Sequence, residues 1–355
     1  MSLVERARRW WNGYVTVETA AAAVPASGLR SSVDHVIILD GTLSTLQAGQ
    51  EGNAGLLYHL LTQNGTRHRH SLQNVYYEPG QQWESWRRGI HIIEGRGVNP
   101  QILRAYGWLA SHYREGDRIF LFGYSRGAYA VRALAGMLGR VGLLKHSHAT
   151  QSAVNLAFRH YMRGGTRPAA RAFAQLYCHP ATRIRMVGVW DTVKALGLRV
   201  PILWRFVSKV HDFPDNYLSE VVDAGFHALA ADETRAAFAP ELWESHPDSA
   251  ARVQQVWFAG THGDIGGNIG RYPECRTLAN VPLTWMLERA EDMGLNLPEN
   301  WRAQFPCDVN APMVGTWRGF GLWFISRARR KIGRDASEAT HPSISQRRSH
   351  MWWEF

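Results

Sequence analysis

The chain has 355 residues, of which 45% are hydrophobic, and its formal net charge is +10. This composition predicts a globular, soluble protein with a large core, and it excludes a transmembrane helix because no run approaches the roughly 18 apolar residues that such a helix needs. The positive charge favours an anionic partner, either phospholipid head groups or nucleic acid, and does not choose between them.

Residues 1–29 are predicted to be a loosely attached N-terminal extension. Glu5 and Glu18 stand where a secretion signal needs a basic start followed by an apolar stretch. We therefore expect a chain that is cytoplasmic at synthesis and carries no conventional secretion signal.

Short apolar runs alternate with helix-like stretches along residues 30–355, which we predict to form one domain. In the helix-like stretches apolar residues recur at intervals of three and four, as Ile102, Tyr106 and Leu109 do. Such alternation predicts an α/β fold with a mostly parallel sheet, helices on both faces, and a ligand site beyond the carboxyl ends of the strands. The predicted strands are 35–39, 74–77, 118–123, 183–190 and 253–258, and the predicted helices are 54–61, 100–112, 128–138 and 278–290.

Two stretches depart from this alternation, and we expect them to be helical cap insertions over an active site. Residues 146–180 are predicted to form two helices. Residues 197–239 are predicted to form a loop with at least one helix, over residues 218–230.

The segment Gly123-Tyr124-Ser125-Arg126-Gly127 has the spacing G-x-S-x-G, with an apolar run before it and a helix-like stretch after it. This context is typical of a nucleophile elbow, in which a serine lies on a sharp turn between strand and helix and the glycines avoid clashes with neighbouring backbone. The helix N terminus directs N–H groups at the same point, so the amide of Arg126 is the predicted first oxyanion donor. An ordinary turn capped by Ser125 explains the context less well.

A serine nucleophile needs a base and an acid that orients the base, and both are expected at the carboxyl ends of other strands. Asp191 directly follows one predicted strand, and His262 lies in a glycine-rich loop after a later strand. Serine, aspartate and histidine in this chain order are typical of α/β-hydrolases. The plainer alternatives are a helix N-cap for Asp191 and an ordinary loop residue for His262.

A second pair, Asp264 with His341, is an alternative acid and base. It fits the usual hydrolase arrangement, in which the acid comes from the second strand after the elbow and the histidine from a later one. Asp264 is only two residues from His262, however, and it has another interpretation: a side chain that braces the loop through backbone amides.

Another predicted strand ends with Asp40-Gly41-Thr42. The pattern resembles the phosphatase motif D-x-D-G-T, but Ile38 stands where that motif has the phosphoryl-accepting carboxylate, so a haloacid-dehalogenase type of phosphatase is excluded. In a hydrolase the loop after an early strand supplies the second oxyanion donor. The amide of Gly41 or Thr42 is our candidate, with Asp40 packing the loop against the elbow, although a plain turn explains these residues nearly as well.

Four ordered motifs, ILDGT, FLFGYSRGAYAVRALAGML, VGVWDTV and VWFAGTHGDIGG, resemble the α/β-hydrolase family of bacterial and fungal proteins that includes the phospholipase effectors of type VI secretion. The resemblance runs from residue 35 to residue 345. It implies an α/β-hydrolase fold with the nucleophile at Ser125, the acid at Asp191 and the base at His262. It also implies export by a specialised secretion system.

The chain departs from this family in two respects. Leu43 and Ser44 follow the D-G-T motif, where tryptophan or asparagine is usual in the family. The long extra regions by which the large effectors engage membranes are missing. Ester hydrolysis is therefore a firmer expectation than phospholipid hydrolysis.

Two groups of aromatic and basic residues bear on membrane contact. One combines Trp317, Phe320, Trp323 and Phe324 with Arg327, Arg329, Arg330 and Lys331, and the other combines Trp10 and Trp11 with Arg6, Arg8 and Arg9. The first group fits a helix that lies on an anionic membrane, but a core-packed helix with a solvated basic end is the favoured interpretation. The second group fits a membrane-touching arm, although a flexible tail is favoured.

We expect no cofactor. The chain has three cysteines, an odd number, without the spacing of a zinc site, so neither a disulfide framework nor a metal centre is predicted. They are Cys178, Cys275 and Cys307. No EF-hand-like series of carboxylates is present, which leaves calcium activation open.

Taken together, these observations predict a serine esterase or lipase, with phospholipid acyl esters as the favoured substrate. A thioesterase or small-ester hydrolase is one alternative. The other is an inactive basic module that binds a membrane or nucleic acid on a hydrolase fold, although we expect no nucleic acid partner. The sequence contains no feature that indicates an oligomeric state.

Overall fold

The computed structural model describes residues 31–42, 44–63, 72–80, 98–193, 216–245, 252–317, 324 and 326–347. The predicted N-terminal extension lies outside these residues. The described chain contains a seven-stranded sheet with the order β2-β1-β3-β4-β5-β6-β7, in which every neighbouring pair is parallel. The strands are β1 Val33–Leu39, β2 Leu72–Glu78, β3 Arg118–Tyr124, β4 Ile184–Trp190, β5 Val222–Ala230, β6 Val253–Phe258 and β7 Glu338–Thr340.

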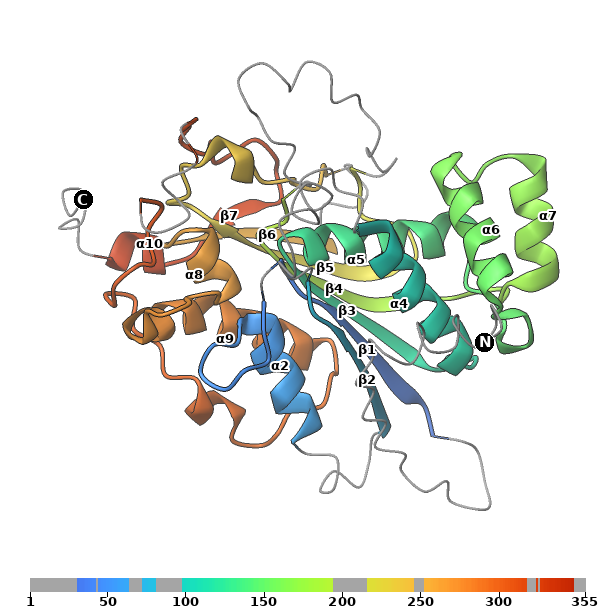
Figure 1. Ribbon diagram of the computed structural model, residues 1–355, viewed down its shortest axis with the longest axis horizontal. Helices are drawn as coiled ribbons and strands as arrows, with labels where there is room; N and C mark the ends of the chain where they lie inside the picture. Colours follow the sequence, from blue (N-terminus) through green and yellow to red (C-terminus); the bar gives the residue numbers. More distant parts are fainter. Residues whose placement is uncertain are drawn as a thin grey trace, which may run out of the picture.

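Helices cover both faces of the sheet, as Figure 1 shows. On one face α4 and α5 pack on the sheet, with α6 and α7 outside them, and on the other face lie α2 and α9 together with the short α8. This confirms the predicted α/β fold. The helices are α2 Asn53–Thr62, α4 Val98–His112, α5 Arg126–Val141, α6 Gln151–Met162, α7 Pro168–Tyr177, α8 His262–Gly266, α9 Arg276–Asp292 and α10 Ser343–Gln346.

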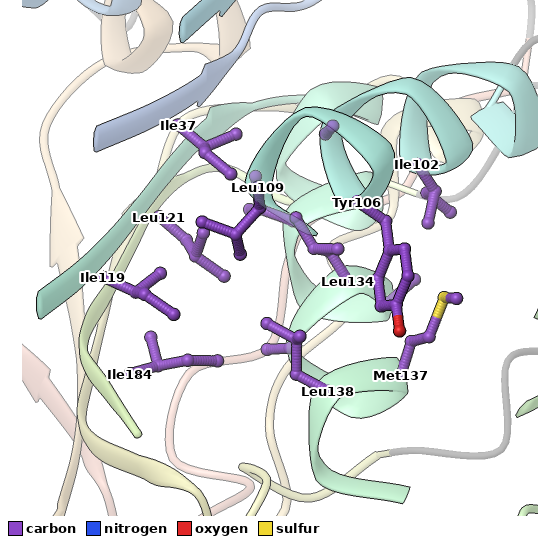
Figure 2. Packing of buried hydrophobic residues seen from close by; sticks show 14 of the residues in the cluster. Ile37, Ile102, Tyr106, Leu109, Ile119, Leu121, Leu134, Met137, Leu138 and Ile184 are labelled. Carbon is purple, nitrogen blue, oxygen red and sulfur yellow. The ribbon is translucent and has the colours of Figure 1, made fainter. Parts of the chain in front are cut away.

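The hydrophobic core on the α4–α5 face explains why these elements form. Ile37 and Leu121 project from β1 and β3 toward Leu109 of α4 and Leu134 of α5, and all four side chains are fully buried (Figure 2). Burying one such side chain contributes about 1.5–3 kcal/mol. This core fixes α5 over β1 and β3, and so it fixes the turn at which α5 begins.

One predicted helix is wrong. Residues 222–230, which we expected within a helix over 218–230, form β5 and pair with β4 and β6. Ala224 and Ala228 recur at helical spacing, and the strand is buried on both faces, so the alternation that marks a half-buried strand is missing. The second candidate cap, 197–239, therefore contains a central strand of the sheet, and its residues 197–215 lie outside the described part.

The first candidate cap, residues 146–180, contains the two predicted helices, α6 and α7, but they do not form a cap. The helices pack against α4 and α5. The segment returns to the sheet through a bridge between Leu144 and Cys178, just beyond the C-terminal end of α5. Helix α5 has 16 residues, so its C-terminal end is about 24 Å from its N terminus. Helices α6 and α7 therefore form an outer part of the helical layer on this face and do not cover the sheet edge where α5 begins.

Candidate active site

Ser125 lies on the turn between β3 and α5, with φ 56° and ψ −118°. A positive φ is strained for any residue other than glycine. A Cβ on Gly123 would lie 2.6 Å from the carbonyl oxygen of Gly127, and a Cβ on Gly127 would lie 2.0 Å from the carbonyl oxygen of Leu39 in β1. The two glycines thus permit the sharp turn and its close contact with β1, and α5 begins at Arg126, whose amide heads the helix.

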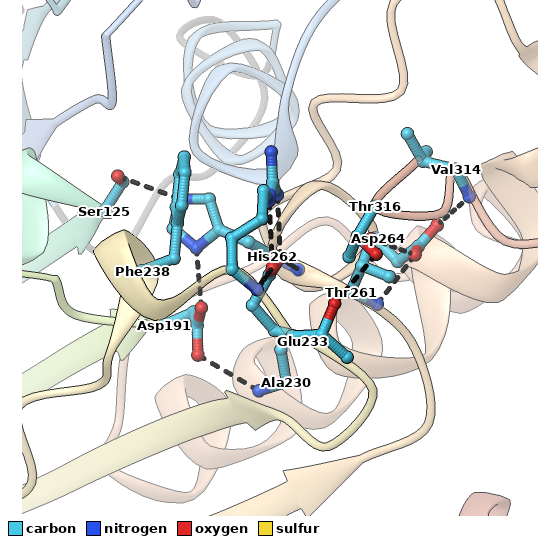
Figure 3. Close-up of polar contacts among 12 residues, drawn as sticks. Ser125, Asp191, Ala230, Glu233, Phe238, Thr261, His262, Asp264, Val314 and Thr316 are labelled. Carbon is cyan, nitrogen blue, oxygen red and sulfur yellow. Dashed lines mark hydrogen bonds and ion pairs between the residues drawn. The ribbon is translucent and has the colours of Figure 1, made fainter. Parts of the chain in front are cut away.

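The side chains of Ser125, His262 and Asp191 form a continuous hydrogen-bonded chain (Figure 3). Ser125 Oγ lies 2.9 Å from His262 Nε2, and His262 Nδ1 lies 2.6 Å from Asp191 Oδ2. The three residues follow β3, β6 and β4, so parallel pairing brings their strand ends to one edge. With its Nδ1 proton directed at the carboxylate, a neutral imidazole presents Nε2 as an acceptor for the serine proton.

The backbone at Asp191 is also strained, with φ 41°. Within the described residues, Ser125 and Asp191 are the only non-glycine residues with positive φ. Backbone strain persists where the surroundings over-determine the conformation, and it clusters at functional sites. Here the N–H of Asp191 donates to the carbonyl oxygen of Ala228 at 2.8 Å, and the N–H of Thr192 donates to His227 Nε2 at 3.0 Å.

The carboxylate of Asp191 is fully buried and surrounded by donors. Oδ1 accepts from the amide of Ala230 at 3.0 Å and from Arg330 Nη1 at 2.5 Å, and Oδ2 accepts from Arg330 Nη2 at 2.9 Å as well as facing His262. Burial alone would raise the pKa of Asp191, but Arg330 and His262 together hold this pKa well below its usual range. Asp191 is therefore ionised at neutral pH.

Two aromatic rings enclose the imidazole of His262. The ring centroids of Tyr124 and Phe238 lie 4.9 and 4.8 Å from that of His262, and the Tyr124 hydroxyl donates to the carbonyl oxygen of His262 at 3.1 Å. Burial lowers the pKa of His262, and the neighbouring Asp191 opposes this effect only in part. The imidazole is therefore neutral at pH 7, as a general base must be.

A second carboxylate, Glu233, supports His262 through the backbone. Glu233 Oε2 accepts from the amide of His262 at 3.1 Å and forms an ion pair with Arg235 at 2.7 Å. Arg235 in turn stacks over Phe238, 4.0 Å from the ring centroid. Burial would raise the pKa of Glu233, but Arg235 holds it below its usual value, so this group is a paired anion.

The loop after β1 lies beside the nucleophile, since a Cβ on Gly41 would be 3.2 Å from Ser125 Cβ. The amide of Gly41 donates to Asp40 Oδ1 at 2.7 Å, so Asp40 shapes this loop and leaves the amide of Thr42 as the better candidate for an oxyanion donor. Gly80 packs against the same loop. A Cβ at this position would lie 1.8 Å from the carbonyl oxygen of Gly41.

The alternative pair of Asp264 and His341 is not brought together. Asp264 Oδ2 accepts from the amide and hydroxyl of Thr261 at 2.8 and 2.7 Å, and Oδ1 accepts from the amide of Val314 at 2.9 Å (Figure 3). His341 Nδ1 accepts from the amide of Ser343 at 3.1 Å. No hydrogen bond or ion pair joins the pair in the described part of the chain. Asp264 instead caps the N terminus of α8, the short helix that begins at His262 where a glycine-rich loop was expected.

The helix considered for residues 317–331 is absent from the described residues of this segment. Residues 326–337 are not helical, because the amide of Ala328 donates to the carbonyl oxygen of Thr234 at 2.7 Å and ties the segment down in another conformation. Arg330 pairs with Asp191, and its side chain is only 4% exposed, so it is not available to a membrane. The N-terminal group of aromatic and basic residues lies outside the described part, as do Phe320 and Trp323.

Neither a metal site nor a membrane span occurs in the described part of the chain. No group of three or more histidine, cysteine, aspartate or glutamate side chains is arranged to hold a metal ion there. The helices of that part include none long and apolar enough to cross a membrane.

Three residues of the site are not predicted from the sequence: Arg330, Glu233 and Gly80. Arg330 was assigned to a basic surface group, because nothing in the sequence relates it to a carboxylate 139 positions earlier. Glu233 is the third residue after β5, and a prediction of that strand would have marked it as a carboxylate near a strand end. Gly80 lies two residues after β2 and carries no motif.

Comparisons with known proteins bear on this site. The family model described as "T6SS, Phospholipase effector Tle1-like, catalytic domain" matches residues 34–289, more than half of the chain. An uncharacterised protein of Saccharomyces cerevisiae is 28% identical over 240 residues, and the match covers 60% of this chain and 33% of that protein. This chain thus spans about a third of the length of the yeast relative.

Two solved structures are similar to the fold. One is an uncharacterised protein from Pseudomonas aeruginosa, with a TM-score of 0.45, 15% identity, and coverage of 78% of this chain and 49% of that one. The other is the Tle1 effector bound to the VgrG spike from the Type 6 secretion system, with a TM-score of 0.37, 19% identity, and coverage of 71% and 55%.

Proposed function

Because this chain belongs to the family of Tle1-like phospholipase effectors of type VI secretion, through their catalytic domain, we propose that it is a serine hydrolase that cleaves acyl ester bonds of phospholipids. Ser125 is the nucleophile, His262 the general base and Asp191 the residue that orients the base. The amides of Arg126 and Thr42 hold the oxyanion. No metal or organic cofactor takes part in this proposal.

The observation that carries the proposal is the pair of hydrogen bonds from Ser125 Oγ to His262 Nε2 and from His262 Nδ1 to Asp191 Oδ2, at 2.9 and 2.6 Å. Three residues far apart in the sequence form this chain at the carboxyl edge of a parallel sheet. The strained backbone at Ser125 and Asp191 supports the same roles, because such strain is retained where function requires it.

The reaction proceeds in two halves. Ser125 Oγ attacks the ester carbonyl carbon while His262 Nε2 takes its proton, and the imidazolium then protonates the departing alkoxide, which leaves an acyl-serine. A water molecule, deprotonated by His262, attacks the carbonyl carbon of the acyl-serine. The bond to Ser125 Oγ then breaks, the imidazolium returns the proton to Oγ, and the fatty acid leaves. In both halves the negative charge that develops on the carbonyl oxygen is held by backbone N–H groups, and loss of one such donor costs about 3 kcal/mol in other hydrolases.

A fluorophosphonate probe tests the nucleophile. We expect it to label the wild-type protein and not Ser125→Ala, whereas Ser345→Ala, which alters an exposed serine, is labelled like the wild type. Mass spectrometry of mixed bilayers incubated with the same proteins should detect free fatty acid and lysophospholipid with wild type and Ser345→Ala only. Labelling that survives Ser125→Ala would show that the nucleophile is assigned wrongly.

Two other functions give different outcomes in these assays. A thioesterase or small-ester hydrolase is labelled by the probe but leaves bilayers intact and turns over only acetyl or butyryl chromogenic esters. An inactive binding module is not labelled under conditions that label a control hydrolase.

Contact with an anionic membrane is a second part of the proposal, since a phospholipase must reach lipid in a bilayer. From Arg118 to Trp190, with both ends included, the chain has eleven lysines and arginines and no aspartate or glutamate. Four of these arginines are exposed on and between α6 and α7, and α7 also carries Leu176, which is 64% exposed. They are Arg159, Arg163, Arg167 and Arg171. A basic surface with an exposed apolar side chain favours adsorption to anionic head groups.

Vesicle sedimentation tests this contact. We expect the protein to sediment with phosphatidylglycerol vesicles and not with phosphatidylcholine vesicles at low salt, and we expect Arg167→Gln with Arg171→Gln to weaken the binding. Arg302→Gln, a change to an exposed arginine on another part of the molecule, is the control. Equal binding by all three proteins would contradict a role for α6 and α7.

Export by type VI secretion is the third part and rests on the family match. We expect the chain to appear in the culture supernatant of its native host and to remain in the cells when the secretion apparatus is deleted. Equal export by the deletion strain would contradict this part without affecting the proposed hydrolase activity.

A further inference from the structure

The side chain of Arg330 binds directly to the candidate triad. Its Nη1 and Nη2 donate to Asp191 Oδ1 and Oδ2 at 2.5 and 2.9 Å, which is a bidentate ion pair with the carboxylate that faces His262. The same two nitrogens donate to the carbonyl oxygens of Ala230 and Phe238 at 2.9 and 2.6 Å. The guanidinium is therefore held in one orientation, and it fixes the carboxylate in the plane that points Oδ2 at His262.

We propose that Arg330 is a positioning residue of the active site, which keeps Asp191 ionised and directed at His262 while it offsets the negative charge that His262 experiences. This inference rests on the proposed serine-hydrolase function. It goes beyond that function because it adds a fourth side chain, and one that lies outside residues 34–289 of the family match.

Burial makes a counter-ion necessary. Asp191 is fully buried, and a buried carboxylate without a cation costs several kcal/mol or takes up a proton. The amide of Ala230 and the imidazole of His262 supply hydrogen bonds, but a neutral imidazole supplies no charge. Arg330 is the cation that forms an ion pair with Asp191 in the described chain, and its side chain is 4% exposed, so water screens the pair little.

The charges around His262 are balanced in pairs. Two carboxylates face it, Asp191 at the end of β4 and Glu233 after β5, and each has its own arginine. The arginines are Arg330 and Arg235. Among the described residues, Tyr124 also packs on His262, and burial raises the pKa of Tyr124 far above the usual value, so it stays neutral. Since neither carboxylate acts on the imidazole as an uncompensated charge, His262 stays neutral near pH 7.

Removal of Arg330 upsets this balance in a predictable direction. An uncompensated Asp191 then favours a proton on the Asp191–His262 pair, so the pair takes up its first proton at a higher pH, whichever atom holds it. The base is consequently protonated up to a higher pH than in the wild type. A purely structural role of Arg330 would lower the rate at every pH without a shift of the profile.

The test is the pH dependence of the rate at which a fluorophosphonate labels Ser125, measured between pH 4.5 and pH 9 for wild type and three variants. For Arg330→Met we expect the acid limb to move up by about one pH unit or more and the rate at pH 6 to fall about tenfold or more. Arg330→Lys keeps the positive charge but loses the bidentate guanidinium. Its acid limb should therefore stay near that of the wild type, while the plateau of its labelling rate is lower. Arg334→Met removes an exposed arginine of the same segment and should match the wild type.

If the wild type is labelled and Arg330→Met is folded but its acid limb does not move, the inference about Arg330 is wrong, while the serine-hydrolase proposal stands. The same holds if Arg330→Lys shifts the limb as far as Arg330→Met does. If the wild type is not labelled at all, the serine-hydrolase proposal is wrong and the inference falls with it.

Circular dichroism establishes whether each variant folds. Should Arg330→Met not fold, the double variant Asp191→Asn with Arg330→Met decides the question, because no buried charge is then unpaired. Recovery of folding in the double variant supports the charge-pair role. Continued failure to fold shows that the contacts with Ala230 and Phe238 are what matters, which overturns the inference.

Discussion

Gly127→Ala tests whether contact with β1 sets the position of Ser125. The added Cβ would lie 2.0 Å from the carbonyl oxygen of Leu39 and 2.7 Å from that of Asp40, whereas real Cβ contacts are not found below 3.0 Å. Both neighbours are backbone atoms, so no rotamer change relieves the clash, and α5 and β1 must move apart by about 1 Å. A displacement of this size at the reacting atoms costs on the order of 10²-fold in kcat/KM, and overpacking lowers the free energy of unfolding by about 1–3 kcal/mol.

The assay is hydrolysis of a chromogenic ester, with thermal unfolding followed by circular dichroism. Gly107→Ala is the matched control, because it makes the same change inside α4, where the nearest atom, Val154 Cγ2, would be 3.7 Å from the Cβ. This control should keep wild-type activity and gain about 0.5–1 kcal/mol from the better helix propensity of alanine. If Gly127→Ala retained kcat/KM within a factor of two of the wild type, the elbow would not depend on this contact.

Three further outcomes follow from the charges of the site. Asp191→Asn should lower kcat about 10³- to 10⁴-fold, as in other triads. It should also lower the unfolding temperature, because Arg330 loses the anion with which it pairs, and an unfolding temperature equal to that of the wild type would contradict this second effect. Because burial lowers the pKa of His262, wild-type kcat/KM should reach half its plateau below pH 6.5, and a midpoint above that value would contradict the account. Burial lowers the pKa of His227 to about 3, so the unfolded chain binds a proton that the folded chain does not, and the free energy of unfolding should fall by up to about 1.4 kcal/mol per pH unit as the pH drops from about 6.5 toward 3. In urea titrations His227→Gln should lessen this slope, and an unchanged slope would exclude His227 as its source.

The features that could be predicted from sequence are those that a short segment encodes. The five predicted strands and four predicted helices all occur, because each has a local apolar pattern. Five consecutive residues predict the sharp turn at Ser125, since the glycines that this turn requires lie next to it in the sequence. The proximity of Asp191 and His262 to Ser125 is predictable because parallel strands bring their carboxyl ends to one edge, so a strand-end residue can be placed without knowing any contact.

The features that could not be predicted depend on contacts between distant segments. Four of the nine residues of β5 are alanine or glycine, its sequence shows no apolar–polar alternation, and only pairing with β4 and β6 makes it a strand. Gly80 is required because the loop after β1 passes within 2.0 Å of where its Cβ would be. Arg330 has exposed arginines near it in the sequence, and its local sequence does not distinguish it from them.

The path of the chain after residue 289, where the family match ends, completes the site. Ser326 accepts a backbone hydrogen bond from Ala236 at 3.0 Å, Ala328 donates one to Thr234, and residues 338–340 then pair with β6 as the edge strand β7. This route places Arg330 beside Asp191, at the carboxyl end of β4. A unit that ended with the family match would keep all three triad side chains but leave a fully buried carboxylate without a cation, at a cost of several kcal/mol. If the proposed triad acts as described, the catalytic unit extends at least to Arg330, and pairing of β7 with β6 holds the segment that contains Arg330 in place.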